Sequence, residues 1–176
     1  MIIVVCGLQG SGKTEAARLI AQKINGIYLS TDLLRKEQIY HLKARMSTYE
    51  ILFESAKELL KRKRDVVLDG TFYKEDLRQK VKEMAKKFKL KIHFVEVICN
   101  ESKIKERIET RFENKTSESK ANFQIYLRFK KLWQPIKERH AVIDNSGDLE
   151  NLRSQIENCY LRLAWSGQNH IGKGAG

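Results

Sequence analysis

The sequence predicts an α/β fold, with five parallel strands in one sheet and helices on both of its faces. Short apolar runs alternate with amphipathic stretches along the chain, and this alternation is typical of strand–helix–strand units. The chain has 176 residues, of which 41% are apolar, so it is long enough for one domain with a sizeable core. We expect that domain to cover residues 1–165, and the glycine-rich residues 166–176 to form a disordered tail.

The predicted strands are short apolar runs, and four of the five end at or just before glycine, serine or aspartate. The first run is continuous and rich in β-branched residues, as expected for a strand buried on both faces. The five predicted strands are Ile2–Cys6, Ile27–Ser30, Val66–Leu68, Ile92–Ile98 and Ala141–Asp144.

The predicted helices carry apolar residues at helical spacing. We expect the stretch from Phe112 to Lys120, which lacks any apolar period, to be a mobile loop within a lid at about 111–121. Pro135 is expected to end the preceding helix or to lie just beyond it. The predicted helices are Gly12–Ile24, Leu33–Leu42, Thr48–Lys63, Lys74–Phe88, Glu101–Arg111, Ala121–Leu132 and Leu149–Leu163.

Composition narrows the possible partners. The net charge of +12 favours a polyanionic partner such as nucleic acid, but solvated, lysine-rich helix faces would give the same balance. No apolar run is long enough to span a membrane, so a cytoplasmic protein without membrane contact is expected. The three cysteines and four histidines are scattered, which disfavours a zinc site or a disulfide framework.

A phosphate-binding motif follows the first strand. The segment from Gly7 to Thr14, called the phosphate loop below, matches G-x-x-x-x-G-K-[ST] at each fixed position. Glycines let successive N–H groups point inward around an anion, and the following helix adds the positive end of its dipole. Lys13 is expected to reach the β- and γ-phosphates, and the Thr14 hydroxyl to bind Mg²⁺. The residues assigned to the nucleotide are Gly7, Gln9, Gly10, Ser11, Gly12, Lys13 and Thr14.

An acidic and a basic residue follow the second strand. Loops at the carboxyl ends of parallel strands face the ligand crevice, so Asp32 should approach the phosphate loop from the side. Its carboxylate can accept the proton of an attacking hydroxyl, and Arg35, one turn later, can hold an anionic group of the acceptor. Alternatively, Asp32 or Thr31 caps the next helix; the two roles are compatible.

The third strand ends in Asp69-Gly70-Thr71. An aspartate at this place resembles a Walker B element that holds Mg²⁺ directly or through water, although apolar strands also end in simple Asp-Gly turns. We assign Asp69 to the metal, and Asp69 and Thr71 to the substrate side. Arg78, on the next helix, either reaches the acceptor or lies on the surface.

Two arginines precede the expected lid. Arg107 and Arg111 lie four residues apart and so share one helix face. Cations there could offset charge that develops on the transferred phosphoryl group, but nearby glutamates would also explain them as an ordinary charged face. The aromatic stripe of Tyr126, Phe129 and Trp133 favours core packing over a base-stacking platform.

These motifs, in this order, resemble the small P-loop kinases related to polynucleotide 5′-kinases, a group that includes zeta-type toxins and chloramphenicol phosphotransferase. The resemblance runs from about Ile2 to Leu152. It implies a P-loop NTPase fold, ATP and Mg²⁺ as ligands, Asp32 as general base, Arg35 as the acceptor-phosphate ligand, and lid arginines at Arg107 and Arg111. Where many relatives carry Ser-Asp-Ala after the lid, this chain has lysine at the middle position, Lys120.

The expected activity is therefore transfer of the γ-phosphate of ATP to a hydroxyl acceptor. The favoured acceptor is the 5′-hydroxyl of a polynucleotide, or a nucleotide or nucleoside; a small metabolite is the alternative. An ATPase switch and a nucleic-acid-binding protein with a vestigial nucleotide site are the other hypotheses. A GTPase is disfavoured because no Asn-Lys-x-Asp signature is present.

Overall fold

The computed structural model describes residues 1–40, 46–113 and 123–165. Each strand is a run of mostly apolar residues, and two of the interior strands, β1 and β3, are buried along their whole length. Such runs match a sheet that is covered on both faces. The strands are β1 (Ile2–Cys6), β2 (Ile27–Ser30), β3 (Val66–Asp69), β4 (Ile92–Ile98) and β5 (Ala141–Asp144).

The five strands form one parallel sheet in the order β2-β3-β1-β4-β5, which confirms the predicted fold class. β1 lies in the centre, and the chain passes first to one side of it and then to the other. The register aligns Asp69 with Val5 on one side and with Ser30 on the other. The carboxyl ends of β1, β2 and β3 therefore meet at one edge of the sheet, where a ligand crevice is expected.

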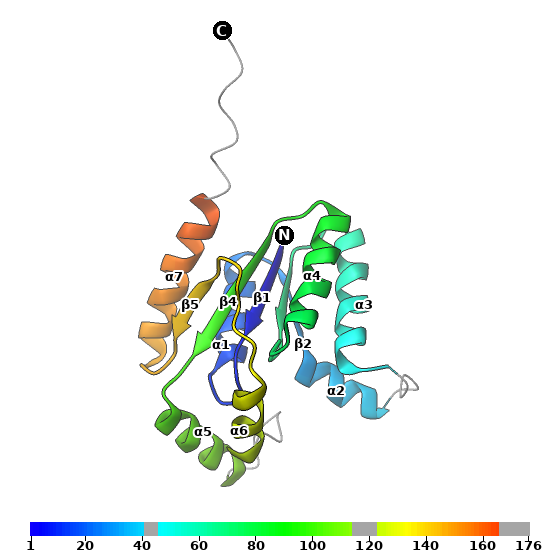
Figure 1. Ribbon diagram of the computed structural model, residues 1–176. Helices are drawn as coiled ribbons and strands as arrows, with labels where there is room; N and C mark the ends of the chain where they lie inside the picture. The colour runs from blue at the N-terminus through cyan, green and yellow to red at the C-terminus, as the bar shows by residue number, and fades with distance from the viewer. Residues whose placement is uncertain (41–45, 114–122, 166–176) are drawn as a thin grey trace.

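The helices cover both faces of this sheet, as Figure 1 shows. One apolar cluster joins the sheet to α1 and α7, and a second joins its opposite face to α3 and α4. Helices α2, α5 and α6 lie toward the carboxyl ends of the strands (Figure 1). The helices are α1 (Lys13–Lys23), α2 (Thr31–Tyr40), α3 (Thr48–Lys61), α4 (Glu75–Phe88), α5 (Glu101–Glu113), α6 (Phe123–Leu132) and α7 (Leu149–Trp165).

Most predicted boundaries agree with these elements to within two residues, and Pro135 lies just beyond α6 as expected. Most of the predicted lid, and the whole tail 166–176, lie outside the described residues. Within the described part of the chain, no helix combines the length and the apolar character that crossing a membrane requires.

Candidate active site

The phosphate loop connects buried strand β1 to the first turn of α1. Gly12, just before the helix, has a φ of +84°, a left-handed conformation that favours glycine. A Cβ at this position would also lie 1.9 Å from Nδ2 of Asn145. Any side chain at Gly12 would therefore strain the backbone and collide with a neighbouring residue, which explains the glycine before Lys13.

Asn145 supports the loop from the end of β5. Its side-chain Nδ2 donates to the Ser11 carbonyl at 2.9 Å, and its backbone N–H donates to the Ile98 carbonyl at 2.9 Å. Its side chain is buried. The sequence analysis missed Asn145, because only the parallel pairing of β4 with β5 brings a residue 134 positions from Ser11 against the phosphate loop.

The loop has the donors and the space that a triphosphate needs. Lys13 is the first residue of α1 and is only 9% exposed. The Ser11 hydroxyl and the Gln9 side-chain oxygen are buried and have no hydrogen-bond partner in residues 1–40, 46–113 and 123–165. Buried polar atoms normally have partners, and the helix N-terminus favours an anion. These features fit a bound phosphate chain, with Lys13 as its cation.

Asp69 lies at the carboxyl end of β3 beside the loop. Its Oδ2 accepts hydrogen bonds from the Thr14 hydroxyl at 2.9 Å and from the Tyr28 hydroxyl at 2.8 Å. Burial raises the pKa of the Asp69 carboxyl, and the Lys13 ammonium partly opposes this shift. Burial also raises the pKa of the Tyr28 phenol, with a further contribution from Asp69, so the phenol remains a donor at neutral pH.

The donor set beside the loop fits Mg²⁺. Oδ1 of Asp69 is buried and has no hydrogen-bond partner within the described part of the chain, while Oδ2 is linked to the Thr14 hydroxyl. Mg²⁺ in phosphate sites is typically held by one or two protein oxygens, phosphate oxygens and water. The described residues contain no cluster of three or more His, Cys, Asp or Glu side chains suited to a metal, so a metal here would depend on phosphate for further ligands.

Asp32 and Arg35 lie together in the first turns of α2. The helix begins at Thr31, and the Ser30 hydroxyl accepts a hydrogen bond from the Asp32 backbone N–H at 3.2 Å. Ser30 therefore caps the helix, and the prediction that Asp32 or Thr31 does so is wrong. The Asp32 carboxylate instead accepts a hydrogen bond from Arg35 at 3.2 Å.

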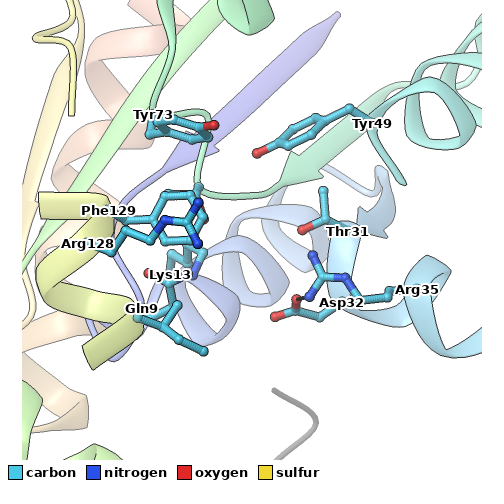
Figure 2. Close-up of a pocket in the computed structure, with 11 residues that line it drawn as sticks. Gln9, Lys13, Thr31, Asp32, Arg35, Tyr49, Tyr73, Arg128 and Phe129 are labelled. Atoms are coloured by element: carbon cyan, nitrogen blue, oxygen red, sulfur yellow. Dashed lines mark hydrogen bonds and ion pairs between the residues drawn. The ribbon is translucent and has the colours of Figure 1, made fainter. Parts of the chain in front are cut away.

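A pocket of about 350 Å³ joins Asp32 and Arg35 to the phosphate loop. Figure 2 shows Asp32 and Arg35 on one side of it, and Lys13 and Arg128 on the other. Predicted residue Thr71 also lines it. The sequence analysis missed the aromatic and basic side chains that complete the wall, since these come from α3, the segment after β3, and α6. The lining residues are Gln9, Lys13, Thr31, Asp32, Arg35, Tyr49, Thr71, Tyr73, Ile125, Arg128 and Phe129.

Arg78 has neither of its predicted positions, because its side chain is fully buried. Its guanidinium donates to the carbonyls of Phe72, Gln134 and Pro135 at 2.7, 2.9 and 3.0 Å. It is not among the residues that line the pocket. Arg78 ties the segment after β3 to the segment after α6, and these two segments flank the pocket wall formed by Tyr73 and Phe129. Its role at the site is therefore indirect.

Arg107 flanks the phosphate loop and does not form an ordinary charged face. Its guanidinium donates to the Asn145 carbonyl at 3.0 Å and to the Cys99 sulfur at 3.4 Å. A methyl group added at Gly12 would lie 3.4 Å from its Nη1. This geometry gives Arg107 a position from which it can reach a nucleotide on the loop. Arg111 belongs to α5, but its side chain lies outside the described residues.

The aromatic stripe of α6 and the following residue divides between core and pocket. Tyr126 is buried in a cluster with Ile104 and Ile108 of α5, and Trp133 packs against the core beneath α3 and α4. Phe129 instead lines the pocket and meets Tyr73 edge-to-face, with ring centroids 4.8 Å apart. The predicted packing role describes Tyr126 and Trp133, whereas Phe129 presents its aromatic ring to the pocket.

Three of the solved structures with a similar fold are two kinases and Kti12. A gluconokinase from Sinorhizobium meliloti 1021 is 18% identical, with a TM-score of 0.64, covering 94% of this chain and 97% of that one. Kti12 from Chaetomium thermophilum, solved with ADP-AlF3, is 20% identical, with a TM-score of 0.66 and coverages of 91% and 97%. APS kinase from Mycobacterium tuberculosis, solved with AMPPNP and APS, is 16% identical, with a TM-score of 0.66 and coverages of 93% and 96%. These likenesses show a shared fold.

The search of curated proteins found no significant match. A family model described as an AAA domain, in contrast, matches residues 2–136, which is well over half of the chain and includes the phosphate loop, Asp32 and Asp69. The predicted membership of a P-loop, kinase-like group is thereby confirmed. The protein belongs to this AAA domain family.

Proposed function

We propose that the protein is an ATP-dependent phosphotransferase, with the 5′-hydroxyl of a polynucleotide, or a nucleotide or nucleoside, as acceptor. The observation that carries this proposal is the pocket in which the Asp32 carboxylate faces Lys13 of the phosphate loop (Figure 2). A hydroxyl bound in that pocket would lie between a proton acceptor and a phosphate-binding lysine. The gluconokinase and the APS kinase among the structural neighbours are consistent with this class of reaction.

In the proposed reaction, Asp32 accepts the hydroxyl proton as the acceptor oxygen attacks the γ-phosphorus of ATP. The bond between that phosphorus and the β,γ-bridging oxygen breaks, and ADP leaves with the electron pair. Lys13 offsets negative charge on the phosphate oxygens. Thr14 and Asp69 would hold Mg²⁺, which supplies further charge neutralisation when bound.

The chemistry of the pocket supports a nucleotide-like acceptor over a purely aliphatic one. Tyr73 and Phe129 present aromatic rings, on which a base can stack. Arg35 and Arg128 lie on opposite sides of the pocket (Figure 2), and guanidinium groups bind phosphate oxygens well. An acceptor with both an aromatic ring and a phosphate would use both features.

The test is transfer of label from γ-labelled ATP to a panel of acceptors. The panel contains RNA and DNA oligonucleotides with a 5′-hydroxyl, the same oligonucleotides with a 5′-phosphate, nucleosides, nucleoside monophosphates, gluconate and APS. We expect label on the 5′-hydroxyl oligonucleotides or on the nucleosides and nucleotides, and none on the 5′-phosphate oligonucleotides. Lys13→Ala sets the background.

Three results would contradict the proposal in different ways. Labelling of gluconate alone would indicate a small-metabolite kinase. Release of inorganic phosphate at a rate that no acceptor changes would indicate an ATPase. Absence of label above the Lys13→Ala background from every oligonucleotide would remove polynucleotides as acceptors.

A further inference from the structure

Tyr28 contacts the proposed metal site from the edge strand of the sheet. Its hydroxyl donates to Oδ2 of Asp69 at 2.8 Å, and the Thr14 hydroxyl donates to the same oxygen at 2.9 Å. The two donors come from different elements, α1 and β2, both of which precede β3 in the chain. The carboxylate cannot turn about its own bond without lengthening at least one of these hydrogen bonds.

These two hydrogen bonds to Oδ2 determine which oxygen of Asp69 can bind a ligand. Oδ1 is buried and has no hydrogen-bond partner among the residues that the structure describes, and a buried carboxylate oxygen is costly to leave without one. Because Oδ2 carries both protein donors, Oδ1 is the oxygen left for a ligand. A cation, or water bound to a cation, is the partner that a carboxylate oxygen beside a phosphate-binding loop would accept.

The Tyr28 ring is held in position by the strand pairing of β2 with β3 and by a contact with Arg18. Tyr28 pairs in register with Val67, two residues before Asp69, so β2 and β3 place the phenol beside the carboxylate. The Arg18 guanidinium lies 5.5 Å from the centre of the ring, at a distance typical of a cation–π contact. Arg18 comes one turn after Thr14 on α1, so one helix contacts both Tyr28 and Asp69.

We propose that Tyr28 is a positioning residue for magnesium binding. It holds Oδ2 of Asp69 together with Thr14 and thereby keeps Oδ1 available to Mg²⁺ or to its bound water. Residues that orient a metal ligand in this way typically contribute about 10- to 100-fold to metal affinity or activity. This inference rests on the proposed function only in taking Mg²⁺–ATP as the donor, and it does not depend on the identity of the acceptor.

The test is Tyr28→Phe, which removes the hydroxyl and keeps the ring. Binding of a fluorescent ATP analogue is measured across a magnesium titration without acceptor. We expect the Mg²⁺ concentration at half-maximal enhancement of binding to rise by about 10-fold or more, while affinity without Mg²⁺ changes less than about twofold. Saturating Mg²⁺ should restore most of the wild-type affinity.

A matched control removes a comparable hydroxyl elsewhere. Tyr126 donates to Oε2 of Glu101 at 3.0 Å, so Tyr126→Phe deletes a tyrosine–carboxylate hydrogen bond away from Asp69. Its magnesium curve should superimpose on that of the wild type. If the Tyr28→Phe curve does the same, the proposal is wrong. A loss of affinity that saturating Mg²⁺ does not recover would also overturn it, because that result indicates a purely structural role.

The same titration separates this inference from the proposed function. If the affinity of the wild-type protein for the ATP analogue does not change with Mg²⁺, the result contradicts the magnesium part of the proposed function. It also contradicts the role of Tyr28. A wild-type protein that responds to Mg²⁺ while Tyr28→Phe responds identically would contradict the role of Tyr28 alone. Transfer to any acceptor does not enter either comparison.

Discussion

The two halves of the candidate site differ in how they are built. On the donor side, Ser11, Lys13 and Asp69 are 1%, 9% and 2% exposed, and hydrogen bonds from other elements hold the loop and the aspartate in place. On the acceptor side, the side chain of Arg35 is 61% exposed and that of Asp32 is 25% exposed. The donor half is therefore buried, whereas the side chains of the acceptor half are more open to solvent.

This difference follows from where the residues lie in the chain. Eight consecutive residues form the phosphate loop, so the local sequence contains most of the donor half. The acceptor pocket draws on α2, α3, the segment after β3, and α6. Donor binding should therefore be insensitive to changes in the acceptor wall, while acceptor choice should depend on a few exposed side chains.

The largest effect is expected from Lys13→Met in the donor half. The change removes a buried cation beside the phosphates, and loss of one such electrostatic group typically costs about 100- to 1000-fold in kcat. Transfer to every acceptor should fall by the same factor, as measured with labelled ATP. Lys80→Met, on the exposed face of α4, is the control and should have wild-type rates. Unequal losses among acceptors would show that the two halves are not separate.

A large effect on stability is expected from Arg78→Met, which disconnects the two segments behind the acceptor wall. Three carbonyls would lose a buried donor, and each unsatisfied group costs about 1 kcal/mol or more. The free energy of unfolding, measured with urea, should fall by about 3 kcal/mol. ATP affinity of the folded protein should stay unchanged. Lys86→Met on the same helix should have little effect on stability; a similar loss there would contradict the account.

A moderate effect is expected from Arg128→Met in the acceptor half. Arg128 lines the pocket opposite Arg35 (Figure 2), and a charge-assisted hydrogen bond to phosphate contributes about 1.5–3 kcal/mol. The KM for a phosphate-bearing acceptor should therefore rise by about tenfold or more, while the KM for ATP stays constant. Lys131→Met, at the neighbouring exposed position, is the control. An equal rise in the KM for ATP would place Arg128 in the donor half instead.

The smallest effect concerns His93 on β4, which belongs to neither half. Burial lowers the pKa of His93 below its usual 6.5, so the folded protein binds this proton less well than the unfolded chain does. The resulting stability is fully present above about pH 6.5 and falls as the pH drops below that value. Urea unfolding at about pH 7.5 and 5.5 should show this loss, and His93→Gln should reduce it. If the free energy of unfolding depends on pH identically in the wild type and in His93→Gln, His93 is not the source of the loss.

Much of the fold could be predicted because its signals are local. Strands β2, β4 and β5 have the predicted bounds, since each is an apolar run beside a polar or turn residue. Helix α2 begins at Thr31, two residues before the predicted Leu33. The prediction was late because Ser30 was interpreted only as a strand end, although serine is also a strong helix cap. The phosphate loop was recognisable for the same reason, since its chemistry is contained in adjacent residues.

The remaining site residues depend on contacts that spacing cannot reveal. Tyr28 reaches Asp69 across 41 positions and Asn145 reaches Ser11 across 134, and only the strand order brings them together. Arg78 was misplaced because arginine is almost never fully buried unless paired, and two of its three carbonyl partners, Gln134 and Pro135, lie 56 and 57 positions away. Asp32, Arg35 and Thr71 of the pocket were predicted, but the lining residues from α3, α6 and the segment after β3 beyond Thr71 were missed because they share no motif.

The measurement that tests the account most directly is the separation of binding from transfer in Asp32→Asn. This change removes the proposed base and preserves the size of the side chain. Transfer from labelled ATP to the best acceptor should fall by about 100-fold or more, while the affinity for Mg²⁺–ATP stays within about twofold of wild type. Asp76→Asn, exposed in the first turn of α4, should change neither quantity. Wild-type transfer by Asp32→Asn would remove Asp32 as the base, and a matching loss of ATP affinity would contradict the division of the site into two halves.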